Sequence, residues 1–162
     1  MTNPGNSKII LAQFYIVTII VTVMAVNTQF PIAVHIMAGL GCRCEKGTTS
    51  GNLAMSVNTS PSFVRRIVSK LSKAGLVATA TGKTGACRLG RDARDISLLD
   101  IYEAVDAPKA FSIHHYAEKK NCAVSCNIKA ALERALGKTQ RAMEASLDDI
   151  SLASIVSDVK KT

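Results

Sequence analysis

The chain has 162 residues, of which 48% are hydrophobic and 4% aromatic, and it carries a formal net charge of +8. A chain of this length buries roughly two thirds of its surface on folding, so it needs neither a disulfide framework nor a structural metal. Five cysteines at irregular spacings are typical of reduced thiols in a cytosol, which excludes a small secreted disulfide scaffold. The basic charge favours nucleic acid or an anionic membrane as the partner.

The chain opens with an apolar run over residues 9–26, which is long enough to be a candidate membrane span or signal anchor. Three interpretations stay open. The run spans a membrane, it packs on the domain as an extra apolar element, or it lies outside the native protein. We favour the third, with Met24 as the start, because a helical pattern with a clear beginning follows at once. Residues 1–26 are therefore treated as an N-terminal extension.

Two helices are predicted to follow this extension. Apolar positions recur at helical spacing over residues 28–40, and Gly39 and Gly41 are expected to end that helix. After a polar loop, Thr49 or Ser50 is the expected cap of a short second helix.

The segment SPSFVRRIVSKLSKAGLV, residues 60–77, predicts a third helix. Asn58 suits the turn before it because asparagine tolerates a left-handed backbone. Ser60 is the expected N-cap, Pro61 the first helical residue and Gly75 the terminator. The predicted buried stripe consists of Phe63, Ile67, Leu71 and Ala74, flanked by Val64 and Val68. The opposite face carries cations and hydroxyls but no acid: Arg65, Arg66, Ser69, Lys70, Ser72 and Lys73.

A hairpin is predicted directly after this helix. The stretch LVATATGKTGACRL alternates apolar and polar residues on both sides of a tip at Gly82–Gly85, and it carries Lys83 and Arg88. Residues 60–95 hold eight cations against two acids, a net charge of +6, as expected of a surface that binds phosphate. Two helices joined by a short turn and followed by such a hairpin predict a winged helix-turn-helix, whose second helix lies in the DNA major groove.

The rest of the chain is predicted to be helical. Ser97 and Asp100 form the pattern of a capping box at the start of a fourth helix. Residues 127–147 repeat apolar positions along one long helix, and the simplest partner for its stripe is the same helix in a second copy. We therefore expect a mainly α fold with a small β wing. It comprises a DNA-binding domain over 27–107 and a sensor linker with dimerisation helices over 108–162.

Several stretches, taken in order, resemble a known family: NTQFPIAVHIM, SPSFVRRIVSKLSKAGLV, GKTGACRLGR, ISLLDIYEAVD and NCAVSCNIKAALE. They are similar to the bacterial winged-helix regulators that include IscR, NsrR and CymR, and the resemblance spans residues 27–155. The stretch HHYAEKKNC looks more like the members without an iron–sulfur cluster. The resemblance implies a cytoplasmic, homodimeric DNA-binding regulator, most often a repressor, on a near-palindromic operator.

The resemblance also implies roles for single residues. The residues assigned to DNA are Ser60, Ser62, Arg65, Arg66, Lys70, Lys73, Lys83 and Arg88. Ser62 and the two arginines would read bases, because arginine suits bidentate contacts with guanine. Ser60 and the two helix lysines would meet phosphates, which position a protein without reading sequence. The wing departs from the family pattern, since Thr81 stands where an arginine is usual, so Lys83 is expected to take over the contact in the minor groove.

Cysteines and histidines supply the candidates for sensing a signal. Cys122 and Cys126 are four residues apart at a predicted helix start, which favours a reactive thiolate and a reversible thiol switch. Cys87 lies in the wing, where an adduct would disturb DNA contact. His114 and His115 could complete a zinc or iron–sulfur set with Cys122 and Cys126, although a cluster needs about four ligands. The main expectation is no cofactor, with a thiol or small-ligand signal.

Two other classes of function are less well supported. Catalysis is not expected, because the sequence offers no nucleophile–base pair, no phosphate-binding glycine loop after a strand and no carboxylate pair in a cleft. A membrane-associated interaction protein is the alternative suggested by residues 9–26. We expect no stable membrane association.

Overall fold

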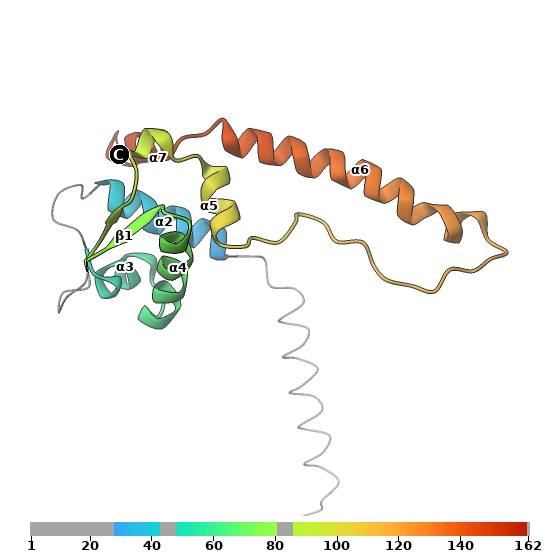
Figure 1. The fold of residues 1–162 in the computed structure, drawn as a ribbon, viewed down its shortest axis with the longest axis horizontal. Coiled ribbons are helices and arrows are strands. Elements are labelled where there is room, and N and C mark those ends of the chain that lie inside the picture. Colours follow the sequence, from blue (N-terminus) through green and yellow to red (C-terminus); the bar gives the residue numbers. More distant parts are fainter. Residues whose placement is uncertain (1–27, 43–47, 81–85, 162) are drawn as a thin grey trace, which may run out of the picture.

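The computed structural model describes residues 28–42, 48–80 and 86–161. Its elements in chain order are α2 (Gln29–Cys42), α3 (Ser50–Val57), α4 (Pro61–Lys73), β1 (Val77–Thr79), β2 (Cys87–Leu89), the 3-10 turn η1 (Ala93–Asp95), α5 (Leu98–Ala104), α6 (Ala123–Asp148) and α7 (Leu152–Lys161). Figure 1 shows a rounded body from which α6 projects. The predicted mainly helical fold with a small two-stranded sheet is confirmed. The apolar run, Met24 and the wing tip with Lys83 lie outside the described residues.

Local sequence determines where the helices start. The Thr49 hydroxyl accepts from the Asn52 N–H at 3.2 Å, and the Ser60 hydroxyl accepts from the Phe63 N–H at 3.3 Å. Each contact satisfies a backbone donor that the first helical turn leaves without a partner. Asn58 has φ 52° and ψ 53°, the left-handed conformation predicted for the turn between α3 and α4. Thus α3, this turn and α4 form the predicted helix-turn-helix.

The end of α4 explains a difference from the predicted stripe. Val64, Ile67, Val68 and Leu71 are buried, but Phe63 is half-buried and Ala74 is exposed. The chain leaves the helix through Gly75, which has φ +73°. The Leu76 N–H then donates to the Leu71 carbonyl at 2.9 Å, so the fully buried Leu76 occupies the core position expected for Ala74.

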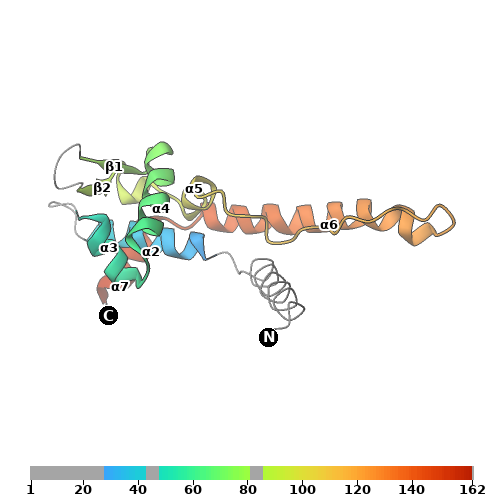
Figure 2. The ribbon, with the colours of Figure 1, turned by 90° about the horizontal axis from the view of Figure 1, so that it is seen from below.

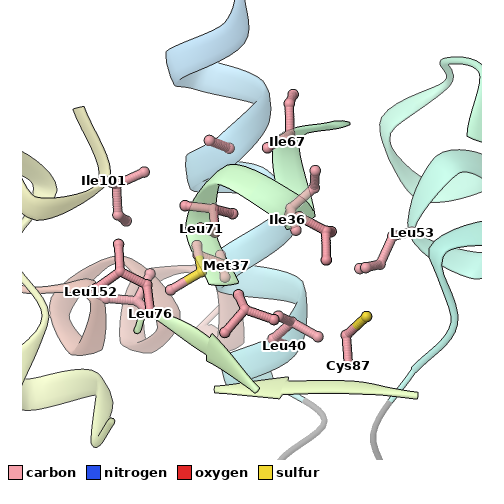
Figure 3. Packing of buried hydrophobic residues seen from close by; sticks show 14 of the residues in the cluster. Ile36, Met37, Leu40, Leu53, Ile67, Leu71, Leu76, Cys87, Ile101 and Leu152 are labelled. Carbon is pink, nitrogen blue, oxygen red and sulfur yellow. The ribbon is translucent and has the colours of Figure 1, made fainter. Parts of the chain in front are cut away.

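The helix α2 crosses the core and is longer than predicted. Its buried Ile36, Met37 and Leu40 meet Ile67 and Leu71 of α4 (Figure 3). The expected end at Gly39 and Gly41 is wrong, because the helix continues to Cys42. Gly41 has a packing role instead. A Cβ atom there would lie 2.7 Å from the Val156 Cγ2 atom, so the absent side chain lets α7 approach α2.

The hairpin forms in the predicted place, with Val77 opposite Leu89 and Thr79 opposite Cys87. The segment before α3 also joins it, because Thr48 exchanges two backbone hydrogen bonds with Cys87, at 3.0 and 2.7 Å. This contact ties the wing to the helix-turn-helix.

The last two helices differ in how they relate to the body. The linker after α5 runs out beside α6, which returns toward the body and leads into α7 (Figures 1 and 2). There the Leu152 N–H donates to the Ile96 carbonyl at 2.8 Å, and the Leu98 N–H donates to the Ile150 carbonyl at 2.9 Å. Leu152 is fully buried. The body therefore contains α7, the last helix of the predicted region 108–162.

Candidate DNA-binding surface

The exposed face of α4 carries most of the predicted DNA contacts. Ser62, Arg65, Arg66 and Lys73 are exposed, whereas the apolar residues between them face the core. The Arg66 guanidinium lies 5.2 Å from the centre of the Phe63 ring, which orients the side chain along the helix surface. The helix contains no acid, so its exposed positive charge is not neutralised within α4.

The beginning of α4 is suited to a phosphate oxygen. The Ser60 and Ser62 hydroxyls lie 3.1 Å apart, beside the first helical turn. Backbone N–H groups of this turn carry the positive end of the helix dipole, which favours an anion.

A groove of about 470 Å³ separates α4 from the wing. Val68 and the buried Cys87 contribute its apolar part. Its full lining is Ser50, Arg65, Val68, Ser69, Ser72, Lys73, Thr79 and Cys87. Arg88 is exposed on the neighbouring strand β2. Sequence reasoning missed Ser50 and Thr79 as neighbours of this surface, because the contact between Thr48 and Cys87 that brings them together has no local sequence signal.

Lys70 differs from the other cations of α4. Its ammonium group donates to the Val105 carbonyl at 2.8 Å and lies 3.2 Å from the Asp106 Oδ2 atom. Within the described residues it is the one cation of α4 that forms an ion pair. The predicted phosphate contact of Lys70 therefore competes with contacts inside the protein.

Two cations that the charge count included are paired with acids. Arg91 lies 3.5 Å from the Asp100 carboxylate, and Arg94 lies 3.0 Å from the Asp92 carboxylate. The hydrogen bond from Arg94 lowers the pKa of Asp92 to about 2. The positively charged surface is consequently smaller than the charge count suggested, and it is concentrated on α4 and the wing.

The three candidate thiols lie in different surroundings. Cys87 is 3% exposed and points into the core (Figure 3). Burial raises its pKa, which disfavours the reactive thiolate. Cys122 is exposed and caps α6, with its sulfur accepting from the Ser125 N–H at 3.5 Å. Cys126 is half-buried in the same first turn, and its thiol donates to the Lys119 carbonyl at 3.5 Å.

The histidines and cysteines of the linker are not arranged as a metal site. The His114 ring stacks on the Tyr116 ring, with centroids 4.9 Å apart. In the described parts of the chain, no three His, Cys, Asp or Glu side chains lie close enough together to hold a metal. His114, His115, Cys122 and Cys126 are thus not brought together as a metal site.

The helix-turn-helix with its wing defines the class of protein, a winged-helix regulator of transcription. A family described as "Rrf2: Iron-dependent Transcriptional regulator" matches residues 26–158. The chain belongs to the Rrf2 family of transcriptional regulators, which confirms the resemblance seen in the sequence.

Individual proteins are similar to the chain in sequence or in fold. The chain is 35% identical to YwnA of Bacillus subtilis, named as an HTH-type transcriptional regulator, over 81% of this chain and 96% of YwnA. Its fold is similar to that of CymR, the global cysteine regulator of B. subtilis, with a TM-score of 0.61 and 23% identity over 83% of this chain and 97% of CymR. It is also similar to IscR of T. potens, with a TM-score of 0.60 and 24% identity over 84% of this chain and 88% of IscR.

The family description names iron. A bound iron–sulfur cluster would require suitable protein ligands among the described side chains. An iron–sulfur cluster takes about four protein ligands, mostly thiolates. The described residues hold four thiols. Cys87 is enclosed by the apolar core, Cys42 is half-buried at the end of α2, and the Cys122 and Cys126 sulfurs are hydrogen-bonded to backbone groups. The described residues do not fit a cluster.

The alternative of a membrane-associated protein rests on residues that the structure does not describe. Across 28–42, 48–80 and 86–161, no helix is both long and apolar enough to cross a bilayer.

Proposed function

We propose that the protein is a cytoplasmic, sequence-specific repressor that binds a near-palindromic operator as a homodimer. The observation that carries this proposal is the exposed, acid-free face of α4 beside the wing. Ser62, Arg65 and Arg66 read base edges in the major groove, and Ser60 and Lys73 contact phosphates. Arg88 is exposed on β2 of the wing, and Lys83 at the wing tip is proposed to contact the minor groove.

The long helix α6 supports the proposed dimer. Its larger apolar residues are half-buried, but Ala131, Ala135 and Ala142 are exposed along its length, and Val124 is 67% exposed. Small side chains of this kind let two helices approach closely. A two-fold dimer would carry two α4 helices, which suits half-sites spaced by about one DNA turn, roughly 34–36 Å.

We further propose a thiol signal at the start of α6. Cys122 and Cys126 lie in one helical turn, at the end of α6 that is remote from the body. A peroxide would oxidise the two thiols to one disulfide: two electrons and two protons pass to the peroxide, which leaves as two water molecules. Closing the disulfide requires the first turn of α6 to move.

A small ligand is the second candidate signal. A groove of about 280 Å³ separates the linker from α6, and its lining combines the apolar Phe111, Ile113 and Leu136 with the charged Lys109 and Glu133. A polar molecule with an apolar part would suit it.

The proposal is tested by footprinting the intergenic DNA upstream of the protein's own gene, with protein purified anaerobically. A specific footprint that peroxide abolishes and a thiol restores supports a redox-switched regulator, and Cys122→Ser should then remove the response while Cys42→Ser keeps it. A footprint indifferent to peroxide moves the search to the groove beside α6. No specific footprint in either state would overturn the proposal. If deletion of the gene lowered the operator's transcript instead of raising it, the repressor assignment would be wrong.

A further inference from the structure

Lys70 lies on the DNA-reading helix, yet its charged group contacts another helix. The ammonium group donates to the Val105 carbonyl at 2.8 Å and to the Gln29 Oε1 atom at 3.5 Å, and it lies 3.2 Å from the Asp106 carboxylate. We infer that Lys70 is a positioning residue, which holds α4 at the end of α5 and transmits the position of the linker to α4. This inference rests on the proposed function, because it concerns the helix that would read DNA.

The contact is chemically specific. Val105 is the C-cap of α5, where the last carbonyls have no partner within the helix and the helix dipole is negative. A lysine ammonium satisfies one such carbonyl and favours that end of the dipole. The Asp106 carboxylate is 82% exposed, so solvent screens its attraction. The hydrogen bond to the Val105 carbonyl is therefore the stronger of these two polar contacts between α4 and the end of α5.

This tie sits where the linker leaves the body. Asp106 has φ 51°, a left-handed conformation that aspartate tolerates better than most residues, and its N–H donates to the Glu103 carbonyl at 3.0 Å. The Tyr102 hydroxyl donates to the Pro108 carbonyl at 2.7 Å, directly after this turn. A shift of the linker that altered the Asp106 turn would rotate the Val105–Asp106 peptide bond, and with it the carbonyl that Lys70 contacts.

A second set of contacts connects the same turn to α6. Gln140 is 8% exposed, and its side-chain oxygen accepts from the Ala110 N–H at 3.0 Å. Its amide nitrogen lies 3.4 Å from the Tyr102 hydroxyl. The buried amide thus links α6, the linker and α5, and Lys70 continues this link to α4. A change at α6 has a continuous path of contacts to the DNA-reading helix.

Lys73 provides a matched control on the same helix. It is exposed, and among the described residues it forms no ion pair. Each phosphate that a protein neutralises contributes about 0.9 to the slope of log affinity against log salt. Lys73→Met should lower the slope by this amount. Lys70→Met should leave the slope unchanged while it weakens binding by about tenfold, since α4 would be held less firmly.

The experiment measures anisotropy of the full-length chain on labelled upstream DNA, over a series of salt concentrations. If Lys70→Met lowered the slope of log affinity against log salt as much as Lys73→Met does, the inference would be overturned. Lys70 would then be a phosphate contact. Circular dichroism checks that the variants fold. If Lys70→Met does not fold, Lys70→Gln replaces it, because glutamine removes the charge but keeps a donor. The same unchanged slope is expected.

The path to the linker is tested by adding Tyr102→Phe, which removes the hydrogen bond to Pro108. Alone, this change should weaken DNA binding about threefold, and in the Lys70→Met background it should have no further effect. A merely structural role would make the two effects add, and additivity would overturn the coupling. Failure of the proposed function would look different from failure of this inference. In that case Arg65→Ala and Lys73→Met would leave DNA binding unchanged.

Discussion

Gly41 and Val156 mark the closest approach of α2 and α7, and a Cβ atom at Gly41 would lie 2.7 Å from the Val156 Cγ2 atom. Val156 is 8% exposed and has core residues around it, so it has little room to move. Gly41→Ala should therefore destabilise the protein by about 1–3 kcal/mol through overpacking, even though alanine favours helices. Urea unfolding measures this change.

Gly39→Ala is the matched control for this prediction. A Cβ atom at Gly39 would meet the Leu53 Cδ2 atom at 3.7 Å, an ordinary contact. The control variant should gain about 0.5–1 kcal/mol of stability from its helix propensity. Equal effects at the two positions would mean that α7 does not pack as closely on α2 as described.

The exposed face of α4 predicts two distinct DNA-binding phenotypes. Arg65→Ala should cost about 1–3 kcal/mol on the specific site and little on random DNA, because arginine contacts to base edges carry the discrimination. Lys73→Met should weaken both nearly equally. Competition assays with specific and random duplexes measure the ratio. Lys129→Ala, on exposed α6, is the control and should leave both affinities unchanged; equal losses on both DNAs in Arg65→Ala would contradict base reading.

The alanine stripe of α6 predicts where a charge breaks the dimer. Ala135→Glu should weaken dimerisation by about 2–4 kcal/mol, because an unpaired charge would be buried between the two helices. Sedimentation velocity over a range of protein concentrations measures the monomer fraction. Lys129→Glu introduces an acid off the stripe and should leave the dimer intact. An unaffected dimer in Ala135→Glu would place the interface elsewhere.

Burial predicts a reactivity order among the thiols. Cys87 is 3% exposed and burial raises its pKa, whereas Cys122 is exposed. Iodoacetamide should therefore modify Cys122 at least about tenfold faster than Cys87 in the native protein, since the reagent needs an accessible thiolate. Mass spectrometry of the peptides gives both rates. In guanidinium chloride the two rates should converge, and similar rates in the native protein would refute the order.

The pairing of Asp92 with Arg94 predicts a contribution to stability that is lost at acid pH. The pKa of Asp92 is lowered from 3.8 to about 2 by the hydrogen bond from Arg94. Because the folded pKa is depressed, the contribution is complete above about pH 4 and disappears as the pH falls to about 2. Carboxyl NMR titration should find the low pKa in the wild type and a value near 3.8 in Arg94→Ala. A low pKa in both proteins would assign the shift to another group.

The predictions that succeeded rest on short-range chemistry. Ser60 and Ser97 are N-caps because a hydroxyl two or three residues before a free N–H can reach it, and this is visible in a few letters of sequence. Asn58 takes its left-handed turn for an equally local reason. The place of the hairpin follows from the alternation of apolar and polar residues in two neighbouring stretches of sequence.

The features that the sequence did not reveal depend on contacts between distant segments. Lys70 reaches the carbonyl of Val105, and Leu152 pairs its backbone with Ile96. Neither contact produces a periodic pattern in the sequence. The helical spacing placed Lys70 with the other cations of α4. The lysine side chain is long and flexible, so its ammonium group can reach acceptors on other elements. The end of α5 lies within its reach only in the folded chain.

The return of α7 to the core has a consequence for protein synthesis. The fully buried Leu152 completes an interior that begins in α2, and the whole of α6 is made between them. A nascent chain that has emerged only as far as the wing therefore lacks part of its own interior. A fragment ending before residue 152 would leave apolar surface on α2 open to water and would be a target for proteases. Completion of this interior thus requires synthesis into α7, so a premature stop before Leu152 yields a chain with an incomplete core.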